Sequence, residues 1–235
     1  MKFSVSPDVF EVLDTLYLGV VVAKGIDNSS PVLAISQLLQ ENIKLVEQQL
    51  DGIKVKETVE VLCYRQAFEK LGVNANKYMS SVEAILTRIG KQKGFPSINP
   101  IVDLGNAVSI KYRLPMGAHD LATVDHSLQV RFAEQDDRFL PFGETEIEQV
   151  EGRELVYVSG QDIRTRRWIW RQSDIGKITE VTRDVLFPID GFSDRNKDAV
   201  LAAREELANY LKEIFNCEIT VGIVDRDNPE FDFSL

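Results

Sequence analysis

Three short polar side chains, Asn99, Asp103 and Asn106, have the spacing of one helical face. At about 100° per residue they would lie together, opposite a face of apolar residues. A solvated helix surface usually carries Lys and Glu, whereas Asn and Asp are poor helix formers. Two interpretations follow. The three residues form a stripe that faces a ligand, or Asn99 caps the helix and Asp103 complements the helix dipole, which leaves only Asn106 unexplained.

A second constellation combines tryptophan with arginine between residues 166 and 172. If this segment is a strand, Trp168, Trp170 and Gln172 point to one side, and Arg167 and Arg171 point to the other. Aromatic faces stack on bases while arginines bind phosphates, so the pattern fits nucleotide binding. Core packing is the alternative for the two tryptophans, and by their residue type alone it is favoured.

Candidates for general acid-base or nucleophilic catalysis are few. His119 and His126 are the only histidines, and neither has a nucleophile or a metal-ligand spacing near it. His119 is a weak catalytic candidate, and no other catalytic residue is predicted. The sequence has no GxGxxG and no Walker loop, so no nucleotide cofactor is expected. Cys63 and Cys217 are far apart and form no zinc motif, so no metal is expected either.

The charge balance limits the partners of this protein. The 235 residues carry 27 basic and 37 acidic side chains, for a net charge of −10. Such a chain repels nucleic acid as a whole, so contact with RNA must be local. One segment, residues 162 to 183, has six basic against three acidic residues. The acidic run from Glu134 to Glu148 is interpreted as a solvated rim, and a divalent-cation site is the alternative.

Neither a membrane span nor a secretion signal is visible, because no apolar run approaches the ~20 residues that a bilayer requires. We therefore expect a cytoplasmic protein that does not bind membranes.

The elements that must position these residues alternate between helix and strand. Helices are expected after Ser6, after Ser30, at 59–71, from Ser80 to Gly94, at 99–113 and at 196–215, with Asn99 and Pro100 starting the fifth. Strands are expected at 16–23, 128–132, 155–158, 167–171, 185–189 and 217–224, and the tail from Asp225 is expected to be loose. This order predicts an α+β fold with a helical N-terminal part and a long C-terminal helix.

Two motifs, Ile98-Asn99-Pro100-Ile101-Val102-Asp103-Leu104-Gly105-Asn106 and Leu114-Pro115-Met116-Gly117-Ala118-His119-Asp120-Leu121, give the chain a family resemblance. It resembles the B3/B4 domain of the phenylalanyl-tRNA synthetase beta subunit, and more closely the free-standing relatives of that domain. Arg131 and Ala133 match a later strand of the synthetase. The free-standing relatives share Tyr64-Arg65-Gln66-Ala67-Phe68 and the Arg-Arg-Trp-x-Trp-Arg-Gln segment.

The resemblance implies a mixed β-sheet core of the B3/B4 type, with a single domain over residues 1–235. Its family-like core spans about 60–192, after a helical extension at 1–59 and before a C-terminal helix and strand at 193–224. It also implies binding of tRNA or aminoacyl-tRNA, and a substrate site formed by Asn99, Asp103, Asn106, Asp120, Arg131, Trp168, Trp170 and Gln172. Arg167 and Arg171 would contact RNA phosphates.

The synthetase domain hydrolyses tyrosine that is wrongly attached to phenylalanine tRNA, so the first functional hypothesis is a trans-acting editing deacylase. This chain departs from the synthetase pattern at Pro96, Gly117, His119 and Arg171-Gln172. The second hypothesis is therefore a non-catalytic module that binds RNA or a small amino-acid-like ligand.

Overall fold

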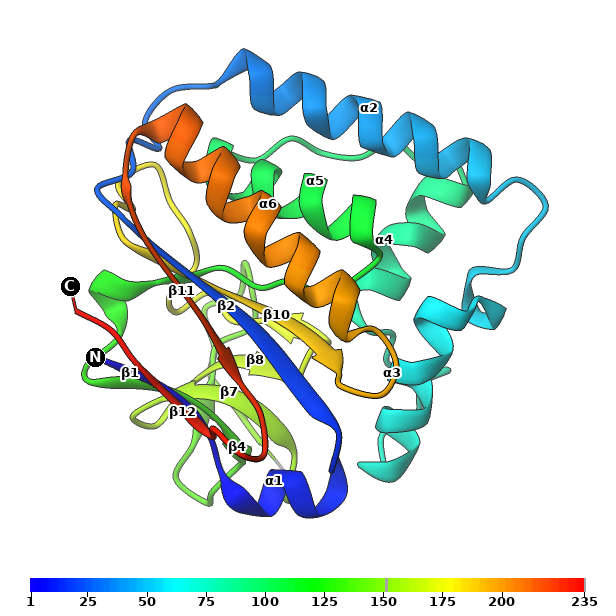
Figure 1. Cartoon of the computed structure of the whole chain (residues 1–235). Coiled ribbons are helices and arrows are strands. Elements are labelled where there is room, and N and C mark those ends of the chain that lie inside the picture. Colours follow the sequence, from blue (N-terminus) through cyan, green and yellow to red (C-terminus); the bar gives the residue numbers. More distant parts are fainter. Residues whose placement is uncertain (151, 235) are drawn as a thin grey trace.

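A computed structural model describes residues 1–150 and 152–234 of the chain. It has three layers: helices, a four-stranded sheet and an eight-stranded sheet (Figure 1). The helices are α1 (Pro7–Val12), α2 (Leu33–Gln49), α3 (Val59–Lys70), α4 (Ser81–Gly90), α5 (Pro100–Tyr112) and α6 (Lys197–Phe215), with 3-10 turns η1 (Val55–Glu57) and η2 (Leu121–Thr123).

The smaller sheet has the order β11 (Glu218–Val224), β2 (Leu16–Lys24), β10 (Val185–Phe192) and β3 (His119–Asp120). The larger sheet has the order β12 (Glu230–Asp232), β1 (Lys2–Val5), β4 (Ser127–Phe132), β7 (Leu155–Ser159), β8 (Asp162–Arg166), β5 (Arg138–Phe139) and β6 (Glu148–Gln149), and β9 (Arg171–Gln172) pairs with β8. β1 runs parallel to β4 and antiparallel to β12.

Strand β2 is buried on both faces, which explains its continuous apolar sequence. Leu18 and Val20 belong to the core between the two sheets, whereas Tyr17 and Val21 belong to the core beneath the helices. Helix α6 packs on β2 and β10, and α5 lies between α6 and α2 (Figure 1). Two apolar cores therefore hold β10 in place from either side.

The structure confirms the α+β fold class and most of the expected elements. Asn99 caps α5 through its side chain, and Pro100 is the first helical residue, as predicted. Ser80 caps α4, although that helix ends at Gly90 and not at Gly94. No helix within residues 1–150 and 152–234 combines the length and the apolarity that crossing a membrane requires.

Three expectations about the secondary structure were wrong. Residues 2–5 form β1 in a region expected to begin with a helix, and the tail expected to be loose contains β12, since the two pair with each other. The third error matters more for the site, because residues 167–170 form a turn and not a strand.

Candidate functional site

Two adjoining cavities flank the segment that leads into β3. One encloses about 520 Å³, including its open mouth, and the other about 590 Å³. Both are lined by Met116, Gly117, Ala118 and Gln172, so they are halves of one groove. We call it the Gly117 groove. The first half also contains His119, Tyr157, Trp168, Trp170 and Asp190, and the second contains Asn106, Phe142 and Lys177.

The floor of the first half is a buried carboxyl group. Oδ1 of Asp190 accepts hydrogen bonds from the Tyr157 hydroxyl at 2.7 Å and from Nε1 of Trp168 at 2.6 Å. Burial raises the pKa of Asp190 from 3.8 to about 7, against the opposing effect of these two hydrogen bonds. Its Oδ2 has no hydrogen-bond partner within the described chain. Asp190 thus offers the groove an acceptor whose charge changes near neutral pH.

His119 lines the same half of the groove and is only 3% exposed. Its ring stacks on Tyr157, with the ring centroids 5.4 Å apart. Burial lowers the pKa of His119 from 6.5 to about 3, with a smaller contribution from the Arg164 charge. His119 is therefore a neutral imidazole and a weak base. Its Nδ1 has no hydrogen-bond partner among the described residues.

Gly117 leaves room for this histidine. A Cβ atom on Gly117 would lie 3.3 Å from Nε2 of His119 and from Cγ of Pro188, which is closer than ordinary van der Waals contact. Position 117 is one of those at which this chain departs from the synthetase pattern, and the imidazole in the groove comes from His119.

One wall of the groove is the turn between β8 and β9. Arg167 and Trp168 both have positive φ angles, of 46° and 59°, a conformation that bulky residues rarely adopt. The turn separates the two tryptophans, which a strand would have placed on one face. Trp168 is fully buried beneath Asp190, as the core alternative required, and Trp170 is half-buried at the groove rim.

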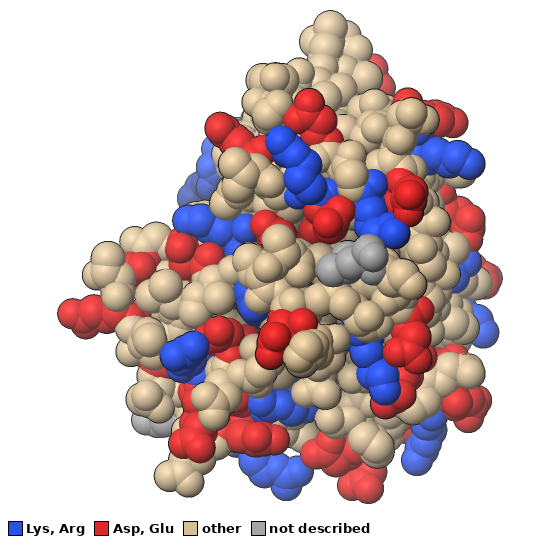
Figure 2. All heavy atoms as spheres, turned by 90° about the vertical axis from the view of Figure 1, so that its left-hand side faces the viewer, with Lys and Arg blue, Asp and Glu red and all other residues tan. Residues whose placement is uncertain are grey.

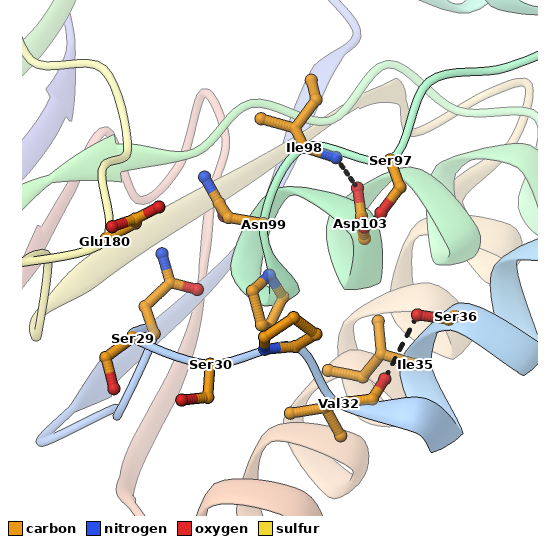
Figure 3. A pocket seen from close by; sticks show the side chains of 13 residues that line it. Ser29, Ser30, Val32, Ile35, Ser36, Ser97, Ile98, Asn99, Asp103 and Glu180 are labelled. Carbon is orange, nitrogen blue, oxygen red and sulfur yellow. Dashed lines mark hydrogen bonds between the residues drawn. The ribbon is translucent and has the colours of Figure 1, made fainter.

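The three residues of the α5 face do not share one cavity. Asn106 lines the second half of the groove, but Asn99 and Asp103 line a separate cavity of about 420 Å³ (Figure 3). Oδ1 of Asn99 caps α5 by accepting from the Val102 N–H at 3.0 Å. The Asp103 carboxylate accepts from the Ile98 N–H and the Ser97 hydroxyl. These are local bonds, as in the capping interpretation.

Two further predicted substrate residues make hydrogen bonds within the fold. Asp120 caps η2 at Ala122 and accepts from the Thr182 hydroxyl at 2.7 Å. Arg131 forms two hydrogen bonds to Asp137, at 2.7 and 2.8 Å, and neither residue lines the groove. Asp137 is also buried, so the expectation that the acidic run from Glu134 to Glu148 is a solvated rim was wrong for this residue.

The basic residues also differ from the expected picture. Arg167 forms an ion pair with Glu154 at 2.8 Å, and its guanidinium lies 3.9 Å from the Tyr78 ring centroid. Arg171 has no ion pair within the described chain. On the face drawn in Figure 2, the described Lys and Arg side chains are interspersed with Asp and Glu and form no broad basic area.

Sequence reasoning missed Asp190, Tyr157 and Tyr78. Asp190 had a signal, because it is the one charged residue within the apolar strand of residues 185–192. A buried acid in such a strand needs hydrogen-bond partners or a function. Tyr157 and Tyr78 had no comparable signal, since tyrosine is common both in cores and on surfaces.

Comparison with known proteins identifies the family. Residues 63–218, more than half of the chain, match the B3/4 domain. The chain therefore belongs to the B3/4 domain family, which confirms the resemblance.

Individual relatives match smaller parts of larger proteins. The phenylalanine–tRNA ligase beta subunit of Colwellia psychrerythraea is 28% identical over 137 residues, which are 57% of this chain and 16% of that subunit. An N-terminal fragment of the phenylalanyl-tRNA synthetase beta subunit from Pyrococcus horikoshii aligns with a TM-score of 0.48 and 11% identity, over 92% of this chain and 49% of the fragment. The chain thus spans about a sixth of the Colwellia subunit and about half of the Pyrococcus fragment.

Proposed function

We propose that this protein hydrolyses the ester bond of misacylated tRNA in trans. The observation that carries the proposal is the Gly117 groove, which is lined by residues of both motifs that carry the family resemblance and combines apolar walls with a few inward polar groups. The matched relative is, by its name, a subunit of a phenylalanine–tRNA ligase, so an aminoacyl-tRNA is the substrate class that the family favours.

Among the described residues, the groove shows no hydroxyl group that is activated as a nucleophile. Ser81 and Thr165 line it, but no hydrogen bond connects either to His119 or Asp190 among the described residues. With a pKa near 3, His119 is a poor general base at neutral pH. The proposed nucleophile is therefore a water molecule. Water adds to the ester carbonyl carbon, the bond from that carbon to the ribose oxygen breaks, and one proton of the water passes to that oxygen. The products are an amino acid and a tRNA with a free ribose hydroxyl.

In this scheme the protein accelerates the reaction by holding the ester and the water in position. The ester lies over Gly117 and Ala118, where the two halves of the groove meet. Gln172 donates a hydrogen bond to the Ala118 carbonyl at 3.2 Å, which holds the rim to this segment. Holding the reactants in a productive geometry can supply a large part of a rate enhancement without a covalent intermediate.

A non-catalytic binding module is the alternative that the same groove supports, because neither His119 nor Asp190 has an evident nucleophile partner. Single-turnover deacylation across a panel of misacylated tRNAs, including tyrosyl-tRNA(Phe), separates the two. Hydrolysis of at least one ester, reduced in Asn106→Ala and unchanged in Asn99→Ala, supports the deacylase. Asn99 is the matched control because it lines the other cavity, and rates are compared per folded molecule because its side chain also caps α5. Binding of uncharged tRNA with no hydrolysis of any ester supports the module.

A further inference from the structure

The aromatic and cationic residues beside the groove form a cluster that the proposed reaction does not use. Tyr78 and Trp170 meet edge to face, with ring centroids 4.8 Å apart. The Arg167 guanidinium lies 3.9 Å from the Tyr78 centroid and 4.7 Å from that of Trp170. Nζ of Lys77 and the Arg171 guanidinium approach the same rings, at 5.0 and 6.0 Å. We call these five residues the Tyr78 cluster.

The cluster is accessible and continuous with the groove. Tyr78, Trp170, Arg167 and Arg171 are all half-buried, and Lys77 is exposed. Trp170 belongs to both the cluster and the groove lining. A chain that leaves the groove over the Trp170 rim therefore meets Tyr78 and its cations next.

The motif from Tyr64 to Phe68, which the proposed reaction does not use, holds the segment that carries Tyr78 in place. Arg65, from the Tyr64-to-Phe68 motif, donates to the Ala75 carbonyl at 3.1 Å, to the Asn76 side chain at 2.6 Å and to Glu83 at 2.7 Å. The bonds to Ala75 and Asn76 fasten the loop directly before Tyr78. Phe68 from the same motif packs on Trp168 beneath the turn, with the ring centroids 6.4 Å apart.

The charge of the cluster is cationic in an otherwise acidic protein. The Arg167 charge is compensated by Glu154, whereas Lys77 and Arg171 have no ion pair in the described part of the chain. Aromatic rings and guanidinium planes bind unstacked bases, and separate cations bind the phosphates between them. A phosphate alone would not require the rings, and an apolar peptide would not require the cations.

We propose that the Tyr78 cluster binds the single-stranded 3′ nucleotides of tRNA that precede the ester-bearing nucleotide. This proposal rests on the proposed function, since it takes the ester-bearing end to lie in the Gly117 groove. The cluster thus supplies the local RNA contact that a net charge of −10 requires. It also shows how the Tyr64-to-Phe68 motif, remote from the groove in sequence, serves the site.

Binding of uncharged RNA tests the cluster without reference to hydrolysis. The probes are an acceptor-stem minihelix with its single-stranded 3′ end and the same minihelix without those nucleotides, measured by fluorescence anisotropy at low salt. Tyr78→Ala should weaken binding of the complete minihelix about fivefold or more, the loss expected for one base stack. Tyr78→Phe should retain binding. The shortened minihelix should bind wild type and Tyr78→Ala equally.

Salt dependence tests the cations. Lys77→Ala should lower the slope of log affinity against log salt by about one, whereas Lys212→Ala, an exposed lysine on α6, should not. Equal affinity of wild type and Tyr78→Ala for the complete minihelix, or no binding by wild type, overturns the proposal. If wild type deacylates tRNA while Tyr78→Ala binds normally, only the cluster assignment fails. If Tyr78→Ala loses binding but no ester is hydrolysed, only the deacylase fails.

Discussion

The Tyr157 hydroxyl donates a 2.7 Å hydrogen bond to Oδ1 of Asp190, and this bond links the two sheets of the fold. Tyr157 lies on β7 of the larger sheet and Asp190 on β10 of the smaller one. The backbone carbonyl of Asp190 in turn accepts from the Tyr64 hydroxyl at 2.8 Å. The floor of the groove is therefore a junction of two sheets and helix α3.

Asp190 should make the protein less stable as the pH rises. Its pKa is raised from 3.8 to about 7, so between these values the folded protein holds a proton that the unfolded chain has released. The free energy of unfolding then falls across this range. Asp190→Asn keeps an oxygen for Tyr157 and Trp168 but removes the titration. Urea unfolding from pH 4 to 8 should show the variant gaining stability relative to wild type, by roughly 2–4 kcal/mol above pH 7. A constant difference at all pH values contradicts this.

Burial of His119 should make the protein more stable as the pH rises, the opposite of the effect of Asp190. Its pKa is lowered from 6.5 to about 3, so in this range the unfolded chain binds a proton that the folded protein excludes. The His119 contribution to stability is complete above pH 6.5 and is lost as the pH falls. His119→Gln should therefore lose less stability than wild type between pH 6.5 and 4, in the same urea titration. If Asp190→Asn and His119→Gln change the slope of the unfolding free energy against pH in the same direction, one of the two pKa shifts has the wrong sign.

The pH profile of deacylation should not contain a histidine inflection. Because the His119 imidazole is neutral and lacks a nucleophile partner, His119→Ala should lower the single-turnover rate by clearly less than about 100-fold. An inflection near pH 7, if present, should belong to Asp190 and disappear in Asp190→Asn. Loss of all activity in His119→Ala, together with loss of an inflection near 6.5, identifies His119 as the general base instead.

A methyl group at Gly117 should press on His119 and Pro188, which both line the groove. The new Cβ would lie 3.3 Å from His119 and Pro188, so Gly117→Ala should cost about 1–3 kcal/mol of stability through overpacking. It should also reduce substrate binding per folded molecule. The matched control is Gly90→Ala at the end of α4, where the nearest atom is 3.7 Å away, an ordinary contact. Thermal unfolding and single-turnover kinetics of both variants measure the two effects, and a fully active Gly117→Ala places the substrate elsewhere.

Arg131 should prove structural, although the resemblance implies a substrate role. Its partner Asp137 has a side chain that is 1% exposed, and removal of one member of such a pair leaves a buried charge. Asp137→Ala should therefore destabilise the fold by about 3 kcal/mol. The rate of deacylation per folded molecule should stay unchanged in both Asp137→Ala and Arg131→Met. A reduced rate with normal stability in Arg131→Met supports substrate contact.

Periodicity predicted the elements well where one pattern dominated. Asn99-Pro100 defined the start of α5, and the apolar spacing of α6 matched its buried residues. Strand β1 has only four residues. A segment this short does not show enough of a period to distinguish a strand from the start of a helix. It is a strand because β4 and β12, remote in sequence, pair with it.

The site was harder to predict than the fold, for two physical reasons. Arg167 and Trp168 adopt left-handed angles that their residue types disfavour, so the segment looked like a strand and its tryptophans appeared to share a face. The second reason is that helical spacing shows which residues share a face but not which hydrogen bonds each side chain makes. Asp103 and Asn106 share a helix face, yet Asp103 bonds to Ser97 and Ile98 while Asn106 lines the groove.

The position of β1 between β4 and β12 has a consequence for the order in which the chain folds. Three segments at residues 2–5, 127–130 and 230–232 must meet before this edge of the larger sheet is complete. Contacts so distant in sequence are slow to form, because the loop entropy is lost before they become favourable. The same holds for β2, which waits for both β10 and β11. During synthesis the smaller sheet should therefore be completed late, only after residues 218–224 of β11 have left the ribosome.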